Sequence, residues 1–273
     1  MADSTTPAPW NDWRSATPAR IALGRAGAGM PTDETLRFGW AHAMARDAIH
    51  AALDAEALAR ALGDQGFATV HARSQAADRT TYLRRPDLGR RLDSEDAERL
   101  RTAASPAGGV DVCFVIGDGL SSLAVDHHAA PLLSALRPLL PAEWRVAPIV
   151  IATQARVALA DDIAELFAAR LSVMLIGERP GLSSPDSLGI YLTHAPKHGR
   201  HDAERNCISN VRPEGLAYDV AAFKLAWLMR EALRRGLSGV DLKDESDSKT
   251  LDSAAPAVAR SASHPAQRDD DTP

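Results

Sequence analysis

The stretch that decides the fold is VDVCFVIGDGLSS, residues 110–122. Its first seven residues are almost continuously apolar and end at a glycine, which is typical of a β-strand buried on both faces of a parallel sheet. Two further apolar runs follow at 146–152 and 171–177, and stretches with helical periodicity at 122–136 and 161–170 separate the three runs. This alternation of strand and helix predicts a parallel sheet with right-handed crossovers.

Further elements are expected on both sides of these strands. After them, the pattern predicts short strands at 188–193 and 207–209 and a helix at 219–235. Before them, helical spacing predicts helices at 32–53, 55–62 and 94–103, with Thr32 as the N-cap of the first and an extended piece at 69–72. We therefore expect an α/β protein in which a helical N-terminal region precedes a Rossmann-like, mostly parallel sheet domain flanked by helices.

The expected boundaries follow from shifts in composition. They are 1–30 for an N-terminal tail and linker, 31–105 for a helical N-terminal domain, 106–242 for the Rossmann-like domain and 243–273 for a disordered polar tail. The last segment is rich in Asp, Ser, Ala and Pro and is too polar to bury a core of its own.

Composition excludes several classes of protein. The net charge is −5 and Arg alternates with acidic residues, so no basic block indicates nucleic-acid binding. No apolar run approaches the ~18 residues of a transmembrane helix, and the N-terminus lacks the pattern of a signal peptide. The two cysteines, Cys113 and Cys207, could form a bridge in an oxidising compartment, but nothing else in the sequence indicates secretion. We therefore expect a reduced, cytoplasmic setting.

Ligands of open parallel sheets bind beyond the carboxyl ends of the strands. Four stretches are expected at this edge, and they lie at 117–121, 153–157, 177–182 and 206–210. The first nearly matches the dinucleotide fingerprint G-x-G-x-x-G, but it lacks the third glycine, and the second strand ends without an acid for a ribose. A nicotinamide-dependent oxidoreductase therefore remains an alternative function. The other explanation of these glycines is a turn that needs them only for its backbone geometry.

Other polar residues are candidates for binding as well. The histidines at 194, 198 and 201 lie among Pro and Gly, so a solvated loop is favoured over a metal cluster, and we expect no metal site in this chain. Residues 126–131 approach the D-x-H-x-x-G signature of histidines that ligate cobalt but end in Pro131, which favours ordinary helix residues. Cys207 has the character of a small core residue. Glu178, at a strand end, is suited to accept hydrogen bonds from a ligand.

Four motifs give the chain a specific resemblance. They are AADRTTYLRRPDLGRR at 76–91, GDGLS at 117–121, IGERPGL at 176–182 and NCISN at 206–210. Through them the chain resembles the small (light) subunit of ethanolamine ammonia-lyase, over roughly residues 17–242. The polar tail has no counterpart in this resemblance.

The resemblance implies a function within a complex. The family's enzyme depends on adenosylcobalamin and converts ethanolamine to acetaldehyde and ammonia by radical migration of the amino group. The large subunit is expected to hold the substrate and the catalytic residues, while the small subunit helps to bind cobalamin. The family's cofactor-contacting positions correspond to Val157, Glu178 and Cys207. Glu178 would accept hydrogen bonds from corrin amides, and the other two side chains would pack on the macrocycle.

The resemblance also bears on partners and location. A hetero-oligomer with the large subunit is expected, with no nucleic acid or membrane, and the Arg-rich segment 79–91 becomes a candidate interface as well as a solvated loop. The protein is expected in the cytoplasm, either free or inside a bacterial microcompartment. A purely structural subunit that assembles the large one without touching the cofactor remains a further alternative.

Overall fold

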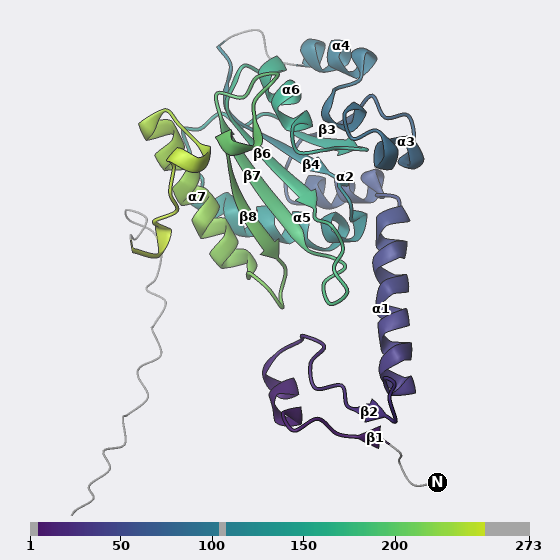
Figure 1. Cartoon of the computed structure of the whole chain (residues 1–273). Helices are drawn as coiled ribbons and strands as arrows, with labels where there is room; N and C mark the ends of the chain where they lie inside the picture. The colour runs from purple at the N-terminus through teal and green to yellow at the C-terminus, as the bar shows by residue number, and fades with distance from the viewer. Residues whose placement is uncertain (1–4, 104–107, 249–273) are drawn as a thin grey trace, which may run out of the picture.

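The computed structural model describes residues 5–103 and 108–248, and its centre is a six-stranded sheet (Figure 1). In spatial order the strands are β3 (Thr69–Arg73), β5 (Ile149–Thr153), β4 (Val110–Gly117), β6 (Ala169–Gly177), β7 (Leu188–His194) and β8 (Arg205–Val211). The first four run parallel. Because β7 is antiparallel to both neighbours, β8 again runs in the direction of β6. The predicted α/β class is confirmed, and the sheet as a whole is mixed.

Helices cover both faces of this sheet, which explains the continuous apolar run in β4. Phe114 and Ile116 face a core formed with α2 (Ala55–Asp64), α5 (Ser122–Leu136) and α7 (Tyr218–Arg235). The alternate side chains, Cys113 and Val115, face a second core formed with α4 (Ser94–Ala103) and α6 (Leu159–Leu166). Since successive side chains of a strand point to opposite faces, both sets are removed from water.

Short helices occupy several connections. One is the α-helix α3 (Arg79–Arg84), and the others are the 3-10 helices η1 (Asn11–Ala16), η2 (Leu88–Arg90), η3 (Arg137–Leu139), η4 (Asp202–Glu204), η5 (Gly239–Asp241) and η6 (Ser246–Ser248). Among the helices of the described ranges, none is both long and apolar enough to cross a membrane.

Several predicted helix boundaries were wrong for identifiable reasons. The helix expected to continue to residue 170 ends at Leu166, because Ala168 adopts a left-handed backbone with φ 46° and β6 begins directly after it. Thr32 is the first residue of α1 (Thr32–His50) and not its cap, since Pro31 occupies the cap position. The same helix ends before residue 53, and Asp54 instead caps α2 by accepting a 2.9 Å hydrogen bond from the backbone of Ala57.

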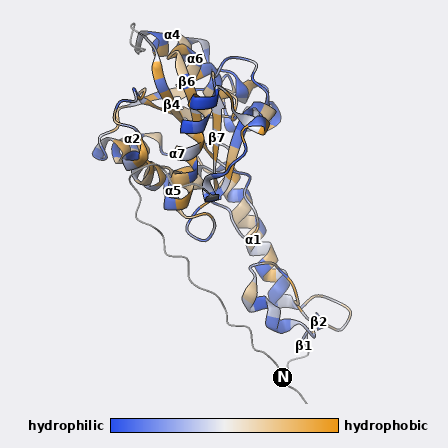
Figure 2. Ribbon diagram, turned by 90° about the vertical axis from the view of Figure 1, so that its left-hand side faces the viewer, coloured by the Kyte–Doolittle hydropathy of each residue, from blue (hydrophilic) through white to orange (hydrophobic). Residues whose placement is uncertain are grey.

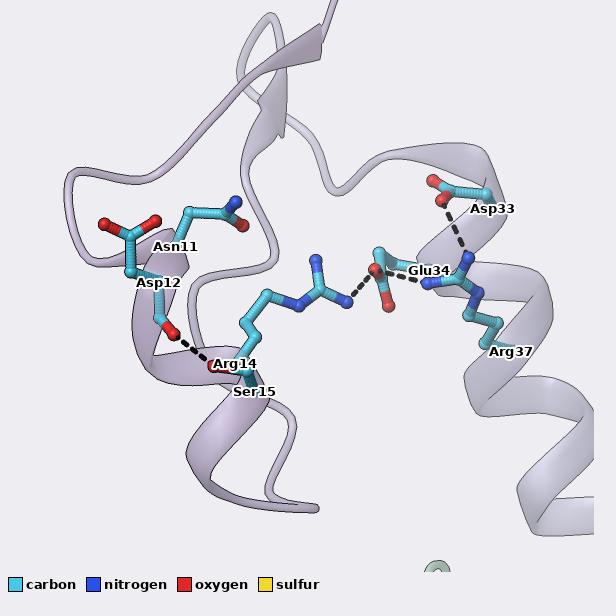
Figure 3. A pocket seen from close by; sticks show the side chains of 7 residues that line it. All are labelled: Asn11, Asp12, Arg14, Ser15, Asp33, Glu34 and Arg37. Carbon is cyan, nitrogen blue, oxygen red and sulfur yellow. Dashed lines mark hydrogen bonds and ion pairs between the residues drawn. The ribbon is translucent and has the colours of Figure 1, made fainter.

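The N-terminal residues form an arm that projects from the sheet (Figures 1 and 2). Helix α1 leads from the sheet to a small hairpin of β1 (Thr5–Thr6) and β2 (Arg25–Ala26) at its far end. Glu34 ties this unit together by accepting hydrogen bonds from Arg14 at 2.6 Å and from Arg37 at 3.0 Å (Figure 3). The described part of the predicted tail and linker, residues 5–30, therefore contains secondary structure of its own.

The sheet crosses the domain boundary that was predicted at residue 105. Strand β3 comes from the segment expected to form a helical domain, yet it pairs along its whole length with β5. At the other end, Lys224 of α7 binds Asp244 at 3.2 Å and Asp247 at 2.8 Å, so these two residues of the segment predicted as a polar tail are held to α7 by ion pairs. Residues 249–273 lie outside the described residues.

Candidate functional site

A cavity of about 410 Å³ opens on the sheet face that α6 covers. Val157 reaches it from the connection between β5 and α6, Tyr191 from β7 and Cys207 from β8. The other lining residues are Pro86, Arg90, Arg156, Ala158, Asp202 and Arg205. The structure thus brings two of the three predicted cofactor residues, Val157 and Cys207, into one cavity.

Strand register determines which side chains meet here. Met174 of β6 pairs with Tyr191, and Tyr191 pairs with Cys207. Paired residues on neighbouring strands share a face, so all three lie on the side of the second core, which also contains Val157. Cys207 is therefore in the body of β8 and not at its carboxyl end as expected. It is also exposed, which corrects the expectation of a core residue, whereas Cys113 is the buried cysteine.

Glu178 follows β6 directly and continues the same face. Its Oε2 accepts hydrogen bonds from the hydroxyl of Ser187 and from the backbone N–H of Asn210, the latter at 3.2 Å. Among the described residues, Oε1 accepts no hydrogen bond. A Cβ placed on Gly189 would lie 3.0 Å from Oε1 and 3.3 Å from the ring of Tyr191, so this glycine keeps the space between carboxylate and ring open.

The local environment keeps the thiol and the phenol neutral. Desolvation around the sulfur raises the pKa of Cys207 although the residue as a whole is exposed; a hydrogen bond with Tyr191 opposes this rise, and the charge of Glu178 adds to it. Desolvation is also the main cause of the raised pKa of Tyr191, with contributions from Cys207 and Glu178. A thiol that stays protonated is a poor nucleophile. The surroundings of Cys207 therefore do not activate its thiol as a nucleophile.

The Arg-rich segment 79–91 contacts the residues that precede Val157. Tyr82 of α3 is fully buried, and its hydroxyl donates a 3.0 Å hydrogen bond to the carbonyl of Ala155. The guanidinium groups of Arg79 and Arg156 both lie over its ring, at 4.8 Å and 4.3 Å from the ring centre. The backbone of Arg156 in turn donates a 2.8 Å hydrogen bond to the carbonyl of Gly89. Part of the segment thus positions the residues that precede Val157, a role that the sequence analysis missed.

The glycine turn after β4 is filled by the protein itself. Gly119 has a φ of 58°, and a Cβ on it would lie 2.2 Å from the carbonyl oxygen of Gly177. A Cβ on Gly177 would lie 1.9 Å from the carbonyl oxygen of Ser121. Between them, the buried carboxylate of Asp118 accepts hydrogen bonds from the backbone of Gln154 and Ala155, both at 2.9 Å. Close packing of two strand ends therefore accounts for the near-match to a dinucleotide fingerprint.

Among the described residues, the histidines at 194, 198 and 201 do not form a group that could hold a metal ion. His198 pairs with Asp162 at 2.8 Å, while the backbone N–H of His194 donates a hydrogen bond to Ser238 and His201 is the N-cap of η4. Within the described ranges, the residues that gather in a geometry suited to a metal ion are His127, His128 and Asp186.

Fold and site together define an α/β protein with an open wall of aliphatic, aromatic, thiol and carboxylate groups on one face of a mixed sheet. Within that class, the family described as "Ethanolamine ammonia-lyase light chain (EutC)" matches residues 7–243. The chain belongs to this family, whose name denotes a subunit of a lyase.

Individual relatives agree with this assignment. The chain is 59% identical over 248 residues to the ethanolamine ammonia-lyase small subunit of Azotobacter vinelandii, which covers 90% of this chain and 92% of that protein. It is 55% identical over 256 residues to the small subunit of the same name from Pseudomonas syringae pv. tomato, covering 93% and 89% of the two chains. The corresponding Pseudomonas putida protein is 54% identical over 261 residues, with coverage of 93% and 96%.

Proposed function

We propose that this chain is the small subunit of an adenosylcobalamin-dependent ethanolamine ammonia-lyase, and that the wall formed by Val157, Cys207 and Glu178 contacts the cobalamin. The observation that carries the proposal is the position of all three side chains on one sheet face, two of them in one cavity. When bound, the cofactor supplies the radical chemistry that converts ethanolamine to acetaldehyde and ammonia. The chain's own part is to bind and orient it.

The residues present fit a corrin ring with amide side chains. Val157 and the neutral thiol of Cys207 offer uncharged surface for the macrocycle. Glu178 has one oxygen engaged within the protein, while its Oε1, which has no hydrogen-bond partner among residues 5–103 and 108–248, can accept a hydrogen bond from an amide N–H. The internal bonds to Oε2 fix the direction in which this free oxygen points, so the acceptor is oriented before a ligand arrives.

The size of the cavity supports a second wall from a partner. Pockets that enclose drug-sized ligands measure about 300–1,000 Å³, and a corrinoid is larger than such ligands. A cavity of about 410 Å³ can therefore cover only part of the cofactor. We propose that the large subunit, which the relatives' name "small subunit" implies, covers the rest and carries the catalytic residues.

The projecting arm supports the same partner. Three apolar residues recur at helical spacing on α1, yet the exposed fractions are 68% for Leu36, 72% for Trp40 and 37% for Met44. Large exposed apolar side chains that gather on one surface mark sites of protein association. We propose that this stripe packs against the large subunit. The two cysteines are free thiols, which supports a reducing, cytoplasmic setting for the assembled enzyme.

The test is retention of corrin by the assembled enzyme. The chain is mixed with the large subunit and cobalamin, unbound ligand is removed by gel filtration, and the visible spectrum is recorded. We expect retained corrin absorbance, a marked loss in Val157→Asp, and no loss in the control Val240→Asp, which carries the same change at a residue that is 60% exposed elsewhere. Assembly without corrin would favour a purely structural subunit, and retention of a nicotinamide dinucleotide in a parallel mixture that contains it would favour the oxidoreductase.

A further inference from the structure

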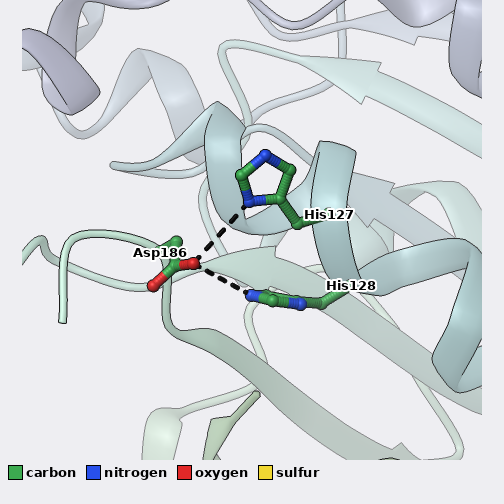
Figure 4. Close-up of side chains that lie close together, drawn as sticks. All are labelled: His127, His128 and Asp186. Carbon is green, nitrogen blue, oxygen red and sulfur yellow. Dashed lines mark ion pairs between the residues drawn. The ribbon is translucent and has the colours of Figure 1, made fainter. Parts of the chain in front are cut away.

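A second cluster of ligating side chains lies away from this wall. His127 and His128 belong to α5, which covers the opposite face of the sheet, and Asp186 belongs to the loop between β6 and β7 (Figure 4). Oδ2 of Asp186 lies 3.6 Å from Nδ1 of His127 and 3.4 Å from Nε2 of His128. The three atoms all lie within 4.8 Å of one another, so they surround one point in space.

One of these atoms is a buried group without a hydrogen bond. The residue His128 is only 4% exposed, and among the described residues its Nε2 makes no hydrogen bond; its nearest charged contact is the carboxylate of Asp186 at 3.4 Å. That separation exceeds the 2.7–3.2 Å or so of a normal N–H···O bond. Buried polar atoms are nearly always paired because an unpaired one costs free energy. Nε2 of His128 therefore points toward Asp186 without forming a hydrogen bond with it.

The other ring nitrogen of His128 is already held. Its Nδ1 lies 2.7 Å from the hydroxyl oxygen of Tyr218. If Nδ1 carries the proton and donates to this oxygen, the lone pair resides on Nε2 and faces the cluster. Histidines that bind metals are oriented in this way, through a hydrogen bond made by the second ring nitrogen.

We propose that His127, His128 and Asp186 bind a divalent transition-metal ion, with Zn²⁺ as the best match. Two imidazole nitrogens and one carboxylate oxygen are the ligand set of zinc sites with an open position, whereas Ca²⁺ and Mg²⁺ prefer oxygen ligands throughout. The side chain of His127 is 57% exposed, so it can rotate to close the coordination sphere and leaves the fourth position accessible to water.

The surrounding charges are compatible with a cation. Apart from the two histidines, the basic side chain that pairs with Asp186 in the described part of the chain is Arg212, whose Nη1 lies 3.9 Å from Oδ1. It faces the oxygen that the histidines do not approach, so Oδ2 remains available to the metal. The guanidinium holds the carboxylate in place from its far side.

A bound ion would pin the loop to α5. The loop is attached near this point by Ser121, whose hydroxyl donates a 2.8 Å hydrogen bond to the carbonyl of Pro185. Ser187, next to Asp186, donates to Glu178. A metal at Asp186 would therefore restrain the segment that orients Glu178 from the opposite face of the sheet. The metal site itself does not depend on the proposed cobalamin function.

The test uses the purified full-length chain without cobalamin, stripped of metal by a chelator. Zn²⁺ affinity is measured by competition with a chromophoric chelator, and Co²⁺ serves as a spectroscopic probe of ligand number. We expect one equivalent of Zn²⁺ and a loss of affinity of more than about tenfold in His127→Gln and in Asp186→Asn, with about tenfold in Tyr218→Phe. His127 is exposed, so its replacement leaves the fold intact, as circular dichroism would verify.

The matched control is His198→Gln. This histidine also faces a carboxylate, Asp162 at 2.8 Å, but within residues 5–103 and 108–248 it belongs to no group of three side chains that could hold a metal ion. We expect its replacement to leave Zn²⁺ affinity unchanged. The proposal is overturned if the wild-type chain binds no Zn²⁺, or if His127→Gln and Asp186→Asn bind it as tightly as His198→Gln does.

Discussion

Replacement of Glu178 by Gln separates the carboxylate's role inside the protein from its role toward a ligand. The amide keeps the size of the side chain and retains one oxygen, which can still accept the hydrogen bonds from Ser187 and from the backbone of Asn210. The group left to face the cavity side is then an NH₂ donor in place of a charged acceptor. The fold should therefore survive, while an amide N–H of a corrin would lose its partner.

The expected magnitude follows from the type of bond lost. A hydrogen bond to a charged group contributes about 1.5–3 kcal/mol, so the dissociation constant for cobalamin should rise about 10- to 150-fold. The assay is spectrophotometric titration of the assembled enzyme with cobalamin, beside thermal unfolding of the same sample. Glu98→Gln is the control, because Glu98 is an exposed carboxylate on α4 that pairs with Arg101 at 2.8 Å. An unchanged cobalamin affinity in Glu178→Gln, with the melting temperature also unchanged, would refute the reasoning.

Three further predictions concern packing, thiol reactivity and pH. Gly119→Ala should lower the free energy of unfolding by about 1–3 kcal/mol more than Gly27→Ala. Both glycines have similar positive φ values, but only at Gly119 would an added Cβ meet backbone atoms. Denaturant titration of both variants measures the difference, and equal losses would contradict the packing argument. Alkylation of Cys207 in the isolated chain should show an inflection above the ordinary thiol pKa because its pKa is raised, and an inflection at or below that value would count against the environment described. Hydrogen bonds from Arg234 and then Arg235 lower the pKa of Glu231 from 4.5 to about 2, so its stabilisation is present above pH 4.5 and is lost as pH falls toward 2. Glu231→Gln should accordingly flatten the acid limb of the stability profile, and an unaltered limb would show that the pairs contribute nothing.

The secondary structure that lies within continuous patterns was largely predictable. The apolar run in β4 and the helical periodicity of α5 are local signals, and the structure places both elements where the pattern predicted them. The boundaries that failed depended on single residues. Ala168 adopts a left-handed backbone conformation, which an alanine in a sequence does not predict. Helix α6 therefore ends earlier than the pattern indicated.

The candidate wall was predictable in its residues but not in its geometry. Val157, Glu178 and Cys207 came from the resemblance to a family, and topology placed them at one edge of the sheet. The register instead sets Cys207 opposite Tyr191, within the sheet. Tyr191 was not identified, because the sequence offers no signal that joins a tyrosine on one strand to a cysteine on another.

The sequence by itself determined the α/β class, the central parallel strands and the family. These depend on periodicity and on motifs that are continuous along the chain. Only the tertiary structure decided that β7 reverses direction, that the stripe on α1 faces outward, and that Asp186 comes to lie beside His127 and His128. The physical reason is that strand pairing and loop position depend on contacts between residues far apart in sequence. A local pattern does not indicate which distant segment will make those contacts.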